Sequence, residues 1–137
     1  MKEVVRVKLE NEMDLILAHK RAMKLCELNG FSLIVQTSIA TAVSEIARCA
    51  IEFGKNAEMI LGIEFTPTKQ FLKAIIRDNK DFSPRCIEAT HYAKRLVDEI
   101  EILKSPRQTD IILKQALSPS RAITDLKLNS FVDYFKR

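Results

Sequence analysis

Hydrophobic and charged residues alternate along the first stretch of the chain. Residues 3–9 read EVVRVKL, and Arg6 and Lys8 stand between apolar positions. This period of two predicts a half-buried strand. The spacing then becomes helical up to about Leu28, with Asn11 as the N-cap and Asp14 completing an approximate capping box. The chain is therefore expected to begin with a strand followed by an amphipathic helix.

The longest apolar stripe belongs to a predicted helix between an N-cap at Ser32 and a stop at Gly54. One carboxylate, Glu45, interrupts the stripe, and Arg48 follows it. The pattern leaves two interpretations open: Glu45 is a solvated residue at the edge of the stripe, or it is a functional carboxylate. Apolar residues recur there three or four positions apart, at Ile39, Val43, Ile46, Ala47, Ala50 and Ile51.

Two pairs of strands are predicted around turns that contain proline. Residues 58–65 and 71–77 flank Thr66-Pro67-Thr68-Lys69, and residues 100–104 and 110–115 flank Ser105-Pro106-Arg107-Gln108. Between the pairs, residues 86–98 predict a third helix, with one stripe at Ile87, Thr90, Ala93 and Val97. The order β-α-α-β-β-α-β-β predicts an α/β fold, a two-layer sandwich with helices on one face of a mixed or antiparallel sheet.

The tail, residues 118–137, is predicted to add a C-terminal helix. Ser118-Pro119 is typical of an N-cap followed by proline at the first helical position. Three interpretations remain open for this helix. It packs on the open face of the sheet, it forms a homodimer contact, or it docks a partner protein. Its apolar positions are Ile123, Leu126, Leu128, Phe131, Val132, Tyr134 and Phe135.

Composition narrows the class of protein. A chain of 137 residues with few glycines and prolines favours a single domain. The three cysteines lack CxxC spacing, so neither a disulfide framework nor a zinc site is expected, and reduced thiols favour the cytoplasm. His19 and His91 have no local metal-ligand spacing. No apolar signal core is found at the N-terminus, and no run is expected to reach the length of a membrane span.

Residues 30–54, GFSLIVQTSIATAVSEIARCAIEFG, resemble a helix of the bacterial anti-sigma-factor and switch serine/threonine kinases. These kinases belong to the histidine-kinase-like (GHKL) ATPases. The resemblance runs from about Glu3 to about Leu117. It implies a Bergerat-type ATPase domain over residues 1–117 and a helical extension over residues 118–137. In this family a Glu at the position of Glu45 is the general base, and an Asn at the position of Cys49 helps to hold magnesium.

The nucleotide-binding motifs of the family are incomplete in this chain. Asp78, in IIRDNKDF, matches the Asp that accepts a hydrogen bond from the adenine amino group. The family continues as D-x-G-x-G, but Lys80 and Phe82 occupy the two glycine positions. No glycine follows Gly62, and the connector before the third helix is shorter than the ATP lid of the family. Because a thiol also replaces the oxygen ligand, we expect neither ATP nor Mg²⁺ to bind.

Purely structural roles are also open for the residues that remain. Glu45 can hydrogen-bond backbone or pair with Arg48 or another base. Asp78 can be a turn residue, and Cys49 can be a small buried hydrophobe.

The resemblance implies a regulatory protein of a bacterial partner-switching circuit. Its expected partner is a protein: an antagonist with a phosphorylatable Ser or Thr, a sigma factor, or a phosphatase. The alternative is an active ATP-dependent serine/threonine kinase, with Glu45 as base and Asp78 at the adenine. The net charge of +4 is modest and the chain lacks a basic strand interleaved with aromatic residues, so neither nucleic acid nor membrane is an expected partner.

Overall fold

The computed structural model describes residues 1–136 and contains a five-stranded sheet in the order β1-β2-β3-β5-β4. All four strand pairs are antiparallel, so the mixed alternative is wrong. The reason is that β5 lies between β3 and β4, which run in the same direction but do not pair. The strands are β1 (Lys2–Leu9), β2 (Ala57–Phe65), β3 (Gln70–Asp78), β4 (Glu99–Lys104) and β5 (Thr109–Ala116).

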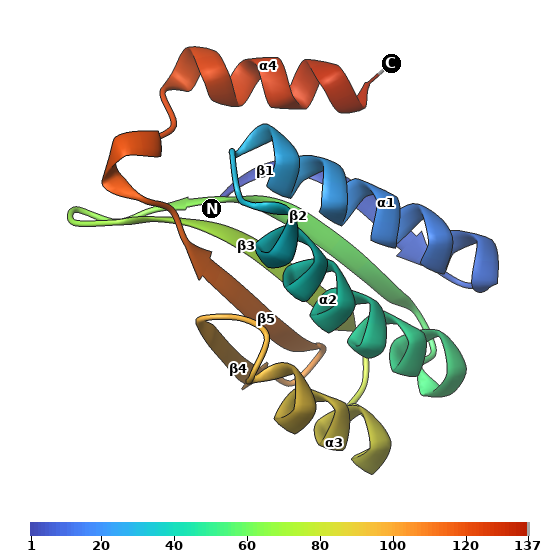
Figure 1. Ribbon diagram of the computed structural model, residues 1–137. Helices are drawn as coiled ribbons and strands as arrows, with labels where there is room; N and C mark the ends of the chain where they lie inside the picture. The colour runs from blue at the N-terminus through green and yellow to red at the C-terminus, as the bar shows by residue number, and fades with distance from the viewer. Residues whose placement is uncertain (137) are drawn as a thin grey trace.

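The helices form a second layer, in the spatial order α4, α1, α2, α3 (Figure 1). The Asn11–Asp14 capping box begins α1 as predicted, and the Ser32 side chain accepts from the Val35 N–H at the start of α2. The expected α/β architecture with helices against one face of the sheet is thereby confirmed. The elements are α1 (Glu12–Leu28), α2 (Leu33–Phe53), α3 (Pro84–Ala93), the 3₁₀ turn η1 (Pro119–Arg121) and α4 (Asp125–Phe135).

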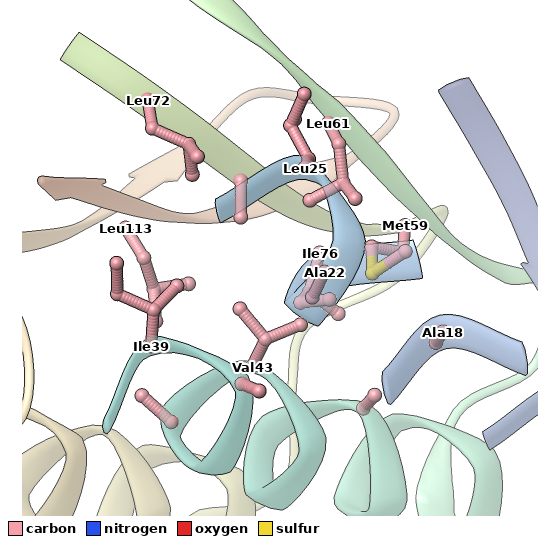
Figure 2. Packing of buried hydrophobic residues seen from close by; sticks show 14 of the residues in the cluster. Ala18, Ala22, Leu25, Ile39, Val43, Met59, Leu61, Leu72, Ile76 and Leu113 are labelled. Carbon is pink, nitrogen blue, oxygen red and sulfur yellow. The ribbon is translucent and has the colours of Figure 1, made fainter. Parts of the chain in front are cut away.

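The main core lies between the helices and the sheet, and α2 is at its centre. Ile39 of α2 lies beside Leu113 of β5, and Val43 of α2 points into the same core, to which β2 adds Met59 and Leu61 (Figure 2). Small residues on α1, such as Ala18 and Ala22, let that helix pack close beside α2. Each of these seven residues is buried, as the alternating and helical patterns require.

The α2 helix is also apolar and long enough, by length and composition alone, to cross a membrane. The prediction that no run reaches such a length is therefore wrong. In the structure, α2 packs between α1 and α3 and against the sheet, as the core helix of a globular domain does. Its buried residues are Ile39, Ala40, Ala42, Val43, Ile46, Ala47 and Ala50.

The opposite face of the sheet carries a second, small cluster made of Ile60, Ile75 and Ile112. Ion pairs between strands surround these side chains, and one of them, Glu64–Lys114, spans from β2 to β5 across β3. The Glu64 carboxylate lies 3.0 Å from Lys73 Nζ and 2.8 Å from Lys114 Nζ. Further pairs are Arg6–Glu58 at 2.8 Å and Arg77–Asp110 at 2.9 Å. The aliphatic stems of these long side chains cover the isoleucines without any helix on this face.

The third helix has different limits from those predicted. It begins at Pro84, where the Ser83 hydroxyl accepts from the Cys86 N–H, and it ends at Ala93 instead of continuing to Asp98. Proline at the first helical position needs no N–H partner, which explains the earlier start. The buried stripe is Cys86, Thr90 and Ala93.

The tail packs on the helical side of the sheet, so one of its three interpretations, that it packs on the open face, is wrong. Ser118 and Pro119 begin only the short turn η1, and Thr124 caps α4. Leu128 and Phe131 join the main core beside β1 and α1. Leu126 is 82% exposed because it lies in the first turn of α4, on the outer side, so its predicted place on the inner stripe is also wrong.

Candidate functional site

Glu45 lies half-buried on α2, and the side chain beside it connects two helices. His19 Nδ1 of α1 lies 2.9 Å from the Ser44 hydroxyl oxygen, so these two residues are hydrogen-bonded. Within residues 1–136, Glu45 forms neither an ion pair with Arg48 nor a hydrogen bond to backbone, and both of these structural roles are therefore excluded there. Its carboxylate is a charge without a paired base on the central helix.

Cys49 lies one turn beyond Glu45, where α3 packs against α2. Its thiol donates to the Arg85 carbonyl oxygen at 3.9 Å, a long contact typical of sulfur, and the Arg85 guanidinium lies 5.5 Å from the Phe53 ring centroid. Cys86 is 1% exposed and close enough to affect the same thiol. Cys49 itself is only half-buried, so it is not the fully buried hydrophobe that one interpretation expected.

The pKa of the Cys49 thiol is raised to about 11. Burial is the largest cause, followed by the neighbouring Cys86 thiol and by the negative charges of Glu45 and Glu52. Cys49 is therefore a neutral thiol near pH 7. A neutral thiol that donates to a carbonyl offers Mg²⁺ no hard oxygen ligand, so this position does not fit the metal that the family holds there.

Asp78 ends β3 and lies against the loop that follows α2. Its Oδ2 accepts a hydrogen bond of 3.1 Å from the Lys55 N–H. A Cβ added to Gly54 would collide with that oxygen and with the Ala50 carbonyl oxygen, which explains why glycine follows the helix. Gly54 has a φ of −82°, so it is required for space and not for a left-handed conformation.

The other oxygen of Asp78 has a different environment. Asp78 is 1% exposed, and its Oδ1 has no hydrogen-bond partner within residues 1–136. Such a buried, unpaired oxygen is unfavourable unless a donor reaches it. Asp78 is thus a tertiary contact for the Lys55 backbone and not the turn residue of the structural interpretation.

Glu45 and Asp78 both lie near α2 but are not brought together. Asp78, the last residue of β3, contacts the loop that follows α2 at Gly54 and Lys55. Glu45 lies on α2 itself, roughly 13 Å before Gly54 along the helix axis. Phe82 lies between β3 and α3, half-buried and packed against the main core. Phe82 thus packs on the core next to α3, which itself packs directly on α2.

Sequence reasoning missed the His19–Ser44 hydrogen bond and the Cys49–Cys86 neighbourhood. Neither pair has a local sequence signal, because the two residues of each pair lie on different helices and are 25 or more positions apart. Across residues 1–136, no three His, Cys, Asp or Glu side chains converge in a way that could hold a metal ion. No protein-family model and no curated protein matches the chain.

Proposed function

We propose that this protein is a non-catalytic regulatory module of the anti-sigma and switch-kinase type, which acts by binding a protein partner. The proposal starts from the resemblance of residues 30–54 to the central helix of that family. One observation carries its non-catalytic part: α3 packs directly on α2 at Cys49, with the thiol of Cys49 against the Arg85 backbone. Bound Mg-ATP would have to separate these two helices.

The partner classes that the resemblance suggests are an antagonist protein, a sigma factor and a phosphatase, all of them in the cytoplasm. A module whose α3 is already packed on α2 has no need for a nucleotide to order this region. We therefore expect partner binding in nucleotide-free buffer that contains EDTA. Binding of a purified partner that occurs only with Mg-ATP would contradict the proposal.

Calorimetry with Mg-ATP tests the nucleotide part directly. We expect no heat of binding up to millimolar ATP, both for the natural protein and for Cys49→Asn, which restores only the metal ligand. The Asn variant is informative because it replaces one of the contacts between α2 and α3 and leaves Phe82 in place. Saturable binding by the natural protein, with transfer of phosphate to a Ser or Thr of an added protein, would overturn the proposal.

The alternative function is an active ATP-dependent serine/threonine kinase, and one observation favours it. Asp78 Oδ1 is buried without a partner in the described chain, and the adenine amino group would supply the missing donor. In that case Glu45 would accept the proton of the substrate hydroxyl. An Asp78→Asn variant separates the functions, because it should abolish ATP binding by a kinase and leave partner binding by a regulatory module unchanged.

A further inference from the structure

A groove lies between α1 and α4, on the opposite flank of α1 from α2 (Figure 1). Its volume is about 540 Å³. The C-terminal helix supplies one wall, so this groove exists only because the chain continues beyond the part that resembles the kinase family. Its lining residues are Lys20, Arg21 and Lys24 of α1 and Tyr134 and Phe135 of α4.

The two walls of the groove differ in chemistry and are joined by one contact. Lys24 Nζ lies 5.1 Å from the centroid of the Tyr134 ring, which is a cation–π distance. The Tyr134 and Phe135 rings meet edge to face, with centroids 5.2 Å apart and planes at 84°. The basic wall on α1 is therefore fixed in place opposite an aromatic wall on α4.

Positive charge is in excess in this groove. Lys24 lies 3.4 Å from the Glu27 carboxylate, which partly neutralises it. Lys20 and Arg21 have no ion pair with a residue of the described range 1–136. Two cations beside an exposed aromatic ring form a surface that attracts carboxylates at a distance of up to about 8 Å in physiological salt.

We propose that this groove binds an acidic segment of a partner protein. Carboxylates of the segment contact Lys20 and Arg21, and an apolar side chain of the segment packs on the Tyr134 ring, which is 42% exposed. The inference rests on the proposed function as a partner-binding module and assigns that function to a surface. Charge complementarity is its basis.

A nucleic-acid strand fits the groove less well than a peptide does. Single strands bind to successive exposed ring faces along a basic track. Here only Tyr134 is exposed, and Phe135 is half-buried at a right angle to it. The cations are confined to little more than one turn of α1, so they do not form a track.

The test is an NMR titration of the whole protein in nucleotide-free buffer. The probe is an eight-residue peptide of alternating Glu and Asp with one central Leu. We expect amide shifts at the five lining residues and weaker binding by about tenfold for Lys20→Glu with Arg21→Glu. The charge-conserving pair Lys20→Arg with Arg21→Lys should bind as the natural protein does.

The matched control is Lys94→Glu with Arg95→Glu, a second pair of adjacent Lys and Arg residues, here both exposed, with the same change of charge. If this control loses as much affinity, or if shifts spread over all exposed lysines, the attraction is unspecific and the proposal is wrong. Tighter binding of a deoxythymidine octamer would also overturn it. ATP binding in calorimetry would refute the proposed function without changing these results, so the two failures are distinguishable.

Discussion

The side-chain amide of Gln70 in β3 brackets the backbone of Ile123. Its Oε1 accepts from the Ile123 N–H at 2.5 Å, and its Nε2 donates to the Ile123 carbonyl oxygen at 3.1 Å. The Leu117 N–H also donates to the Gln70 carbonyl oxygen at 2.9 Å. Three hydrogen bonds to one residue of the sheet therefore fix the segment that leads into α4.

Replacing Gln70 with Ala should loosen the C-terminal segment. The Ile123 N–H and carbonyl lose their partners, and the free energy of unfolding should fall by about 1–3 kcal/mol. Urea denaturation measures the loss, and limited proteolysis should cut near residues 117–124 before the rest. Gln108→Ala is the control, since the Gln108 side chain makes no hydrogen bond to any of residues 1–136. If both variants lowered the free energy of unfolding equally, the hydrogen bonds between the Gln70 side chain and Ile123 would make no specific contribution to stability.

Replacing Gly54 with Ala should destabilise the contact between α2 and β3. The new Cβ would collide with Asp78 Oδ2 and the Ala50 carbonyl oxygen, so either β3 or the helix end must move. Overpacking of this kind costs about 1–3 kcal/mol, which thermal unfolding can measure. The double variant with Asp78→Ala should recover part of the loss. If the double variant were no more stable than Gly54→Ala, the collision with the Ala50 carbonyl oxygen alone would account for the loss.

The thiol of Cys49 should react faster as the pH rises. Its pKa of about 11 leaves few thiolates at neutral pH, so the rate of labelling by iodoacetamide should increase by about tenfold per pH unit between roughly pH 7 and 10. Glu45→Gln removes a negative charge that disfavours the thiolate, and should speed labelling severalfold at fixed pH.

Cys26 serves as an internal control for that measurement. Burial raises its pKa to about 12 and keeps it fully covered, so intact-protein mass spectrometry with peptide mapping should find it labelled last. A rate at Cys49 that is independent of pH would contradict the raised pKa.

Glu64→Gln should destabilise the open face of the sheet. Hydrogen bonds from Lys114 and Lys73 outweigh burial and lower the pKa of Glu64 below 4.5, so the carboxylate stabilises the fold above that pH. The variant should lose about 1–2 kcal/mol at pH 7. The difference from the natural protein should shrink as the pH falls through the lowered pKa, because Glu64 then becomes neutral.

Glu3→Gln is the matched control for Glu64→Gln. Glu3 also pairs with a base, Arg6, at 2.7 Å, but both side chains are 44% exposed. Solvent screens such a pair, so the loss should stay below about 1 kcal/mol in urea denaturation at pH 7. Equal losses at Glu3 and Glu64 would show that the arrangement around Glu64 has no special stability.

Local signals predicted much of the fold. The Asn11 cap and the two turns at residues 66–69 and 105–108 depend only on neighbours, and the structure contains all three. The missed start of α3 had a local signal too: Ser83-Pro84 is the same pair that was recognised at Ser118. At Ser118 the same pair produces only a 3₁₀ turn, because α4 begins after a separate cap at Thr124.

The arrangement around Glu45 and Asp78 could not be predicted in this way. Asp78 meets the Lys55 N–H across 23 positions, and the Cys49 thiol meets the Arg85 carbonyl across 36. Such contacts depend on how α2, α3 and β3 pack, which no spacing within one element reveals. The inner and outer sides of α4 likewise depend on its neighbours, so Leu126 was misplaced on the basis of periodicity alone.

The position of α4 beside β1 has a consequence for how the protein is made. Val4 and Val5 leave the ribosome well before Leu128 and Phe131, which share their apolar cluster. A growing chain therefore has an uncovered hydrophobic edge until α4 has emerged. Chaperone binding to this edge during synthesis, ending when α4 is released, would be the cellular signature of that order.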